Sequence, residues 1–272
     1  MSLANLIKQI NPTLHKQYIL ESYTNNASTF SPVEKPEFKF ETPKFSNDSS
    51  PLQKLDSVNS LDDEHYCKEY VIKRGIPKEH HRNLFYAENF KSFVHELEIS
   101  NDDIYKHLYE EPRLVIPFFD KSRKMFAVQG RALGQSDLRY ITVRIDEQYP
   151  KIYGLDRVDL NKPVMITEGP IDSLFLDNAI ALAGADAVVN IQQKQCTMIF
   201  DNEPRNKQII DRMKKVVDKK FNLVVWPKSL NIKDINDMII AGNTSAKIQT
   251  IISNNTYCGL EALQQINDWK KV

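Results

Sequence analysis

Cysteine is scarce in this 272-residue chain, which contains only Cys67, Cys196 and Cys258. The three residues lie far apart and form no C-x-x-C pair, so the pattern excludes a disulfide framework and a cysteine-based zinc module. We therefore predict three reduced thiols packed in the core of an intracellular protein.

Long apolar runs and an excess of one charge are also missing. No apolar segment approaches the roughly 18 residues of a membrane helix, and no basic segment followed by an apolar one opens the chain. We expect a soluble, cytoplasmic protein with no membrane partner. Lys plus Arg and Asp plus Glu each total 36, which gives a formal net charge of zero. Any site for nucleic acid must therefore be a local patch of basic side chains.

Two nucleotide-binding motifs are absent as well. The sequence has neither G-x-x-x-x-G-K-[ST] nor G-x-G-x-x-G. A P-loop ATPase and a dinucleotide-dependent oxidoreductase are therefore disfavoured.

Changes in composition divide the chain into segments. Residues 1–23 have the spacing of an amphipathic helix with a break near Asn11-Pro12, and residues 24–59 are rich in Ser, Asn, Pro and Lys, which predicts a partly disordered linker. Ser60 is expected to cap the next helix. The predicted units after the linker are a basic α+β subdomain at 60–160, a parallel-sheet domain at 161–241 and a helical segment at 242–272.

The basic subdomain contains a predicted hairpin. Apolar runs at 114–119 and 125–131 flank a turn, and short strands near 140–143 and 152–154 continue the antiparallel sheet. Basic side chains are distributed along these strands, including Arg113, Arg131, Arg139 and Lys151. From composition alone, such cations are more often solvated or paired than functional.

Strands and helices alternate in the second half of the chain. We predict strands at 164–167, 179–183, 197–200 and 221–226, with helices at 170–178 and after Pro204. This alternation indicates right-handed crossovers and a parallel sheet. The predicted fold class is α/β, with an α+β basic subdomain before the parallel sheet.

Acidic residues follow the predicted strands at their carboxyl ends. They are Glu168, then Asp201 and Glu203, then Asp234 and Asp237. Since the carboxyl ends of parallel strands form one ligand-binding edge, we expect these side chains to converge.

Such a group of carboxylates has a clear chemical preference. The like charges repel one another unless divalent cations neutralise them, and oxygen ligands favour Mg²⁺ or Mn²⁺. These are the usual ions of phosphoryl and nucleotidyl transfer. Taken singly, Asp172, Asp234 and Asp237 are equally compatible with starting or capping helices.

A resemblance to a known family limits the range of functions that this acidic edge can have. The segments E-G-P-I-D-S-L at 168–174 and I-F-D-N-E at 199–203 resemble the Toprim fold shared by bacterial-type primases, topoisomerases and some nucleases. The upstream segments R-L-V-I-P-F at 113–118, Q-G-R-A-L at 129–133 and K-I-Y-G-L at 151–155 are similar to the basic subdomain before Toprim in bacterial and phage DNA primases. The resemblance covers about residues 60–240.

The resemblance implies template-directed synthesis of short RNA primers on single-stranded DNA by two-metal nucleotidyl transfer. Its implied catalytic and metal-binding acids are Glu168, Asp201 and Glu203, with Asp234 and Asp237 completing the metal set. Its implied residues for the template or triphosphates are Arg113, Arg131, Arg139 and Lys151. Glu168 is a metal ligand or a general base, and the sequence leaves both roles open.

The chain departs from the family pattern in two places. Glu203 and Pro204 stand where the family often has an aspartate and a small residue, and no four-ligand zinc module precedes the basic subdomain. We therefore expect no zinc in this chain. The implied partners are single-stranded DNA, ribonucleoside triphosphates, a replicative helicase and a zinc-binding primase module in trans, within a bacterial or phage-infected cell.

Two other functions remain open. A Toprim-family nuclease would share Glu168 and the Asp201 cluster but would not need the basic sheet to bind triphosphates. A non-catalytic replication adaptor would bind single strands through that sheet, with Glu203 as a sign of lost catalysis. Metal titration, together with strand binding by a Glu168→Gln variant, separates these alternatives.

Overall fold

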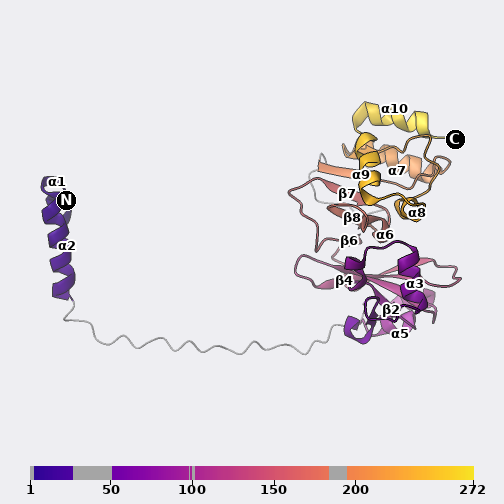
Figure 1. Ribbon diagram of the computed structural model, residues 1–272, viewed down its shortest axis with the longest axis horizontal. Helices are drawn as coiled ribbons and strands as arrows, with labels where there is room; N and C mark the ends of the chain where they lie inside the picture. The colour runs from indigo at the N-terminus through magenta and orange to yellow at the C-terminus, as the bar shows by residue number, and fades with distance from the viewer. Residues whose placement is uncertain (1–2, 27–50, 98, 100–101, 184–194) are drawn as a thin grey trace. The chain divides into compact units, whose positions relative to one another are not determined.

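The computed structural model describes residues 3–26, 51–97, 99, 102–183 and 195–272 (Figure 1). The chain divides into two compact units, residues 1–48 and 49–272. The described part of the first unit is a pair of helices, α1 (Leu3–Ile10) and α2 (Pro12–Asn26). The predicted break is confirmed, since Asn11 Oδ1 accepts from the Thr13 and Leu14 amides and so caps α2. The predicted linker lies outside the described residues between 27 and 50.

The first sheet of the larger unit is antiparallel and has the order β1-β2-β3-β4-β5. Its strands are β1 (Asp56–Ser57), β2 (Phe85–Ala87), β3 (Arg113–Phe119), β4 (Met125–Ala132) and β5 (Tyr140–Arg144). The predicted hairpin is confirmed as β3 and β4. The structure differs from the predicted linker at its end, because residues 51–54 form a 3-10 helix and β1 joins the sheet.

Short helices surround this sheet: α3 (Tyr66–Lys73), α4 (Lys78–His81), α5 (Phe90–His95) and a 3-10 turn at Asp102–His107. The expected Ser60 cap is wrong. His65 is the N-cap of α3, and its side chain accepts from the Cys67 amide at 3.2 Å. Ser60 instead bonds to Ser57 in the preceding turn.

The second sheet has the order β11-β10-β9-β7-β8-β6. Its strands are β6 (Ile152–Tyr153), β7 (Val164–Thr167), β8 (Ala179–Leu182), β9 (Cys196–Ile199), β10 (Asn222–Val224) and β11 (Thr256–Tyr257). The predicted parallel sheet is confirmed, because β10, β9, β7 and β8 pair in parallel. The placement of 152–154 in the first sheet is wrong. β6 pairs antiparallel with β8, where Ile152 and Tyr153 are buried in the hydrophobic clusters on the two faces.

Helices cover both faces of the second sheet: α6 (Pro170–Ser173), α7 (Lys207–Asp218), α8 (Ile235–Ile240), α9 (Ser245–Asn254) and α10 (Gly259–Trp269) (Figure 1). α7 and α10 pack on one face, and α6, α8 and α9 on the other. α6 is shorter than the predicted 170–178 helix. α7 begins later than Pro204, because Asn206 accepts from the Gln208 amide at 3.1 Å and the Ile209 amide at 3.4 Å.

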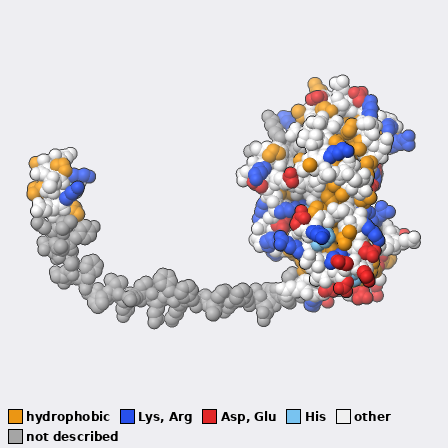
Figure 2. All heavy atoms as spheres, in the orientation of Figure 1, with side chains coloured by type: hydrophobic (Ala, Val, Ile, Leu, Met, Phe, Trp, Pro, Cys, Tyr) orange, Lys and Arg blue, Asp and Glu red, His pale blue; other side chains and the backbone are white. Residues whose placement is uncertain are grey.

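One hydrophobic cluster joins the two sheets, since it contains Leu114 and Phe118 of β3 together with Ala181 and Val224 of the second sheet. Cys67 and Cys196 are buried as predicted, but Cys258 is exposed. Figure 2 shows acidic and basic side chains intermixed over the visible face of the larger unit. None of the helices in the described ranges is long and apolar enough to cross a membrane.

Candidate active site

A cleft of about 540 Å³ lies where the carboxyl ends of β7, β9 and β10 meet the face of β4 and β5. Its acidic lining residues, here the acidic wall, are Glu168, Asp172, Asp201, Asp234 and Asp237. Its basic wall consists of Arg74, Arg131 and Arg139, and Arg212 and Lys233 lie beside the acids. The predicted convergence of strand-end acids therefore holds for all but Glu203.

Glu168 links two neighbouring strand ends. It follows β7, and its Oε2 accepts from the Asp201 amide at 3.0 Å, directly after β9. Its Oε1 pairs with Arg212 of α7. A side chain at Gly169 would come within 3.0 Å of the Asp172 carboxylate, so the glycine leaves room for that acid to turn toward the cleft.

Burial and mutual repulsion raise the pKa values of three acids in the acidic wall, Asp172, Asp201 and Asp234. The pKa of Asp201 rises to about 7 because of burial and the nearby Glu168 and Asp234 charges. The pKa of Asp172 rises to about 8 because of burial and the charge of Asp234. Burial also raises the pKa of Asp234. The wall therefore holds negative charge at a cost that bound positive charge would relieve.

Sequence reasoning treated Asp172 only as a possible helix-start residue, and the structure shows why it belongs to the cleft. Its Oδ1 accepts from the backbone N–H of Asn236 at 2.9 Å, and this bond joins α6 to α8 beside the other acids of the cleft. Asp234 has both of the roles considered, since it lines the cleft and caps α8 by accepting from the Asp237 amide at 2.7 Å.

The donor chemistry of the acidic wall suits a hard divalent cation, because every ligand atom is a carboxylate oxygen. Within the described ranges, no group of three or more His, Cys, Asp or Glu side chains is already assembled around a metal position. Arg212 and Lys233 pair with the acids instead. Metal binding would therefore require these cations to share or release their carboxylates.

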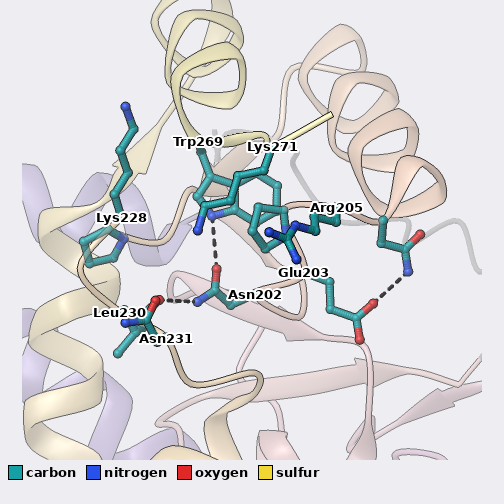
Figure 3. Close-up of a pocket in the computed structure, with 11 residues that line it drawn as sticks. Asn202, Glu203, Arg205, Lys228, Leu230, Asn231, Trp269 and Lys271 are labelled. Carbon is teal, nitrogen blue, oxygen red and sulfur yellow. Dashed lines mark hydrogen bonds between the residues drawn. The ribbon is translucent and has the colours of Figure 1, made fainter.

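Glu203 lies outside the cleft, in a second cavity of about 570 Å³ (Figure 3). Its Oε2 accepts from Asn206 Nδ2 at 2.7 Å, and its Oε1 pairs with Lys233 Nζ at 2.9 Å. The hydrogen bond from Asn206 and the one from Lys233 lower the pKa of Glu203. Lys233 Nζ is also 3.7 Å from Asp201 Oδ2, so one ammonium group connects the two acids.

Asn202 holds the loop that carries these acids, a role that no motif in the sequence indicates. Its Nδ2 donates to the carbonyls of Leu230 at 2.8 Å and Ile232 at 3.0 Å. Its Oδ1 accepts from Trp269 Nε1 at 3.0 Å, at the end of α10 (Figure 3). The backbone N–H of Asn202 also donates to the Lys233 carbonyl at 2.6 Å. The acidic loop is therefore attached both to the β10–α8 connection and to the C-terminal helix.

Aromatic side chains hold Arg131 of the basic wall in place. Arg131 is only 8% exposed; its Nε donates to the Tyr70 hydroxyl at 3.0 Å, and its guanidinium lies 4.6 Å from the Tyr140 ring centroid. Arg74 was missed by sequence reasoning because it is the C-cap of α3, far in sequence from the basic strands. Its Nη1 donates to Asn236 Oδ1 at 2.7 Å, next to the acidic wall.

Arg113 and Lys151, which were predicted to face the substrate, do not line the cleft. The Arg113 side chain is 2% exposed, pairs with Glu111 and donates to the carbonyls of Gly130 at 2.9 Å and Leu138 at 2.7 Å. Across the β3–β4 hairpin Arg113 opposes Ala132, whereas Arg131 opposes Leu114. The two arginines therefore point to opposite faces of the sheet.

Known proteins are similar to this chain in sequence and in fold. No family model matches the chain. The chain is 34% identical over 275 residues to the DNA primase of Enterobacteria phage T4, covering 98% of this chain and 78% of that protein. The zinc-binding and RNA polymerase domains of the Aquifex aeolicus primase align with a TM-score of 0.54 at 18% identity, covering 80% of this chain and 65% of that one. A DnaG primase catalytic domain bound to single-stranded DNA aligns with a TM-score of 0.53 at 14% identity, covering 74% and 75%. These two structures share the fold.

Proposed function

The chain belongs to the DNA primase family, and we propose that its cleft is where short RNA primers are synthesised on a single-stranded DNA template. The observation that supports this placement best is the opposition of an acidic and a basic wall in one cleft. Nucleotidyl transfer needs both, because the reacting phosphates are anionic and the metal ions that activate them need carboxylate ligands.

We propose that Glu168, Asp201 and Asp234 hold Mg²⁺ or Mn²⁺, with Asp172 and Asp237 beside them. Bound there, such ions would favour ionisation of a ribonucleotide 3′-hydroxyl and neutralise the leaving pyrophosphate. Arg212 orients Glu168 through their ion pair. Glu203 acts on the site indirectly, because it positions the Lys233 ammonium group beside Asp201.

The basic wall is proposed to hold phosphates. Arg131 and Arg139 line the cleft opposite the acids, and the aromatic contacts of Arg131 keep its guanidinium in a fixed plane. A planar, fixed guanidinium suits bidentate contact with a phosphate. Arg113 has a different role, since its buried hydrogen bonds join β3 to β4 and to residue 138.

The proposed partners are a single-stranded DNA template and ribonucleoside triphosphates. A solved primase of the same fold is bound to single-stranded DNA, which supports the template assignment. A replicative helicase and a zinc-binding primase module in trans are further proposed partners that rest on the family resemblance. The proposed place of action is the cytoplasm.

The test is RNA synthesis from ribonucleotides on single-stranded DNA with Mg²⁺ or Mn²⁺, with a zinc-binding module supplied in trans in a parallel reaction. Glu168→Gln should abolish the short RNA products, whereas Asp211→Asn, a matched charge removal on the exposed side of α7, should not. Products from Glu168→Gln at the unaltered rate would contradict the proposed site. Cleavage of the strand instead of synthesis would favour a nuclease, and strand binding without metal or product would favour an adaptor.

A further inference from the structure

Two side chains of β4 that line the cleft each carry a buried polar atom without a hydrogen-bond partner among the described residues. Gln129 is 5% exposed and Arg131 is 8% exposed, and both line the cleft. Among the residues that the structure describes, Gln129 Oε1 and Arg131 Nη1 have no hydrogen-bond partner. Because buried polar atoms in folded proteins are nearly always paired, this pair of atoms marks a place for polar groups of a ligand.

The Gln129 amide is held by a neighbouring strand. Gln129 opposes Thr142 across the β4–β5 pair, and its Nε2 donates to Thr142 Oγ1 at 3.0 Å. That bond uses one end of the amide and leaves the Oε1 acceptor for a donor in the cleft. A hydroxyl group fits this position well, because it can donate to the amide oxygen while accepting from another group.

Arg131 sets the chemistry next to this acceptor. It follows Gln129 by two residues on the same strand, so the two side chains share a face and start roughly 7 Å apart. The Arg131 Nε is already bonded to Tyr70, which leaves the cationic Nη1 for an anion. A ligand that satisfies both atoms presents an acceptor, best an anionic one, and a hydrogen-bond donor within about the length of one nucleotide.

We propose that Gln129 accepts a hydrogen bond from the 2′-hydroxyl of a ribonucleotide whose phosphate is held by Arg131, and that Gln129 thereby selects ribonucleotides over deoxyribonucleotides. This inference rests on the proposed function. A templated polymerase must accept different bases in turn, so a fixed acceptor is better matched to a group that all its substrates share than to an amine found on some bases. The 2′-hydroxyl is such a group, and it is the one that distinguishes RNA from DNA.

The preference for ribonucleotides follows from the unpaired Gln129 Oε1. Within the part of the chain that the structure describes, Gln129 Oε1 is already buried without a partner, which is costly; a ribonucleotide would supply the missing donor, whereas a deoxyribonucleotide would leave the acceptor unpaired. A site built to bond a substrate hydroxyl rejects analogues that lack it much more strongly than an apolar pocket would. Gln129→Met keeps the length of the side chain but removes the acceptor, so it should lose this selection.

The experiment compares kcat/KM for ribonucleotides and 2′-deoxyribonucleotides during primer extension on single-stranded DNA. The ribonucleotide preference should fall about 10-fold to 100-fold in Gln129→Met. It should stay unchanged in Gln148→Met, a matched substitution at an exposed position outside the cleft. An unchanged preference in Gln129→Met overturns the inference. A changed preference for guanosine over inosine triphosphate, without a change in the sugar preference, also overturns it.

A second measurement uses the unaltered protein and so does not depend on folding of the variant. A 2′-fluoro substituent cannot donate a hydrogen bond, so 2′-fluoro nucleotides should be discriminated against like 2′-deoxynucleotides. Their use at the full ribonucleotide rate would overturn the inference even if Gln129→Met fails to fold. Absence of any RNA product from the unaltered protein would instead overturn the proposed function itself.

Discussion

Replacing Asp172 with asparagine should change how the stability of the metal-free protein depends on pH. The folded-state pKa of Asp172 is raised to about 8 by burial and by the charge of Asp234, whereas an aspartate in the unfolded chain titrates near 3.9. The folded protein therefore binds the extra proton between these two values, and its stability falls as pH rises through that window. A pKa difference of this size corresponds to at most about 6 kcal/mol of stability lost above pH 8.

The Asp172→Asn variant avoids this cost because its amide stays neutral at every pH. It also keeps an oxygen that can accept from the Asn236 amide, as Asp172 Oδ1 does at 2.9 Å. Urea unfolding without divalent metal should give similar stabilities for the variant and the unaltered protein below about pH 4. At pH 8.5 the variant should be more stable by about 2–5 kcal/mol.

Two controls define the result. Asp211→Asn, at an exposed position of α7, should show no pH-dependent difference from the unaltered protein. Saturating Mg²⁺ should stabilise the unaltered protein more than Asp172→Asn, because the cation relieves the repulsion that the substitution removes. A stability difference that stays constant from pH 4 to pH 9 would refute the assignment of Asp172 as a buried, destabilised acid of the cleft.

Other residues of the site and its supporting sheet give further predictions. Trp269→Phe removes the donor to Asn202 and should lower kcat about 3-fold to 10-fold with KM for ribonucleotides unchanged, because the acidic loop loses one attachment; a steady-state rate assay that finds only KM altered would contradict this. Gly130→Ala would place a methyl group 2.6 Å from Phe90 and 2.9 Å from Arg113, so denaturant titration should show a loss of about 1–3 kcal/mol. Arg113→Met removes the ion pair with the partly buried Glu111 and the donors to the Gly130 and Leu138 carbonyls, and should cost about 3–5 kcal/mol in the same titration, whereas loss of substrate binding with full stability would argue for a direct role.

The sequence was sufficient to predict the parallel sheet and the acids at its edge. Apolar runs that end in Glu168 and Asp201 make each strand and its carboxyl end visible locally, and parallel pairing then places both acids at one edge. Asp172 was predicted only to start or cap a helix, and its place in the cleft was missed, because an acid in either position has the same local sequence pattern. Only the packing of α6 against α8 distinguishes them.

The basic side of the site was less predictable, because it depends on pairing between distant segments. The register of the β3–β4 hairpin directs Arg131 to the cleft and Arg113 to the opposite face, and composition contains no information about that register. Arg74 at the end of α3 and Arg212 of α7 are distant in sequence from the basic strands, yet both reach the site. Glu203 was grouped with Asp201 by spacing, yet Asn206 and Lys233 hold it in the neighbouring cavity.

The most direct test of the central claim is the rate of RNA synthesis on single-stranded DNA when one residue of each wall is changed. Asp201→Asn removes a charge from the acidic wall, and Arg131→Met removes one from the basic wall. Each should lower the rate by at least about 100-fold, as expected for groups that stabilise charge in the transition state, while Asp211→Asn keeps the unaltered rate. Full RNA synthesis by either Asp201→Asn or Arg131→Met would contradict the assignment of this cleft as the site of primer synthesis.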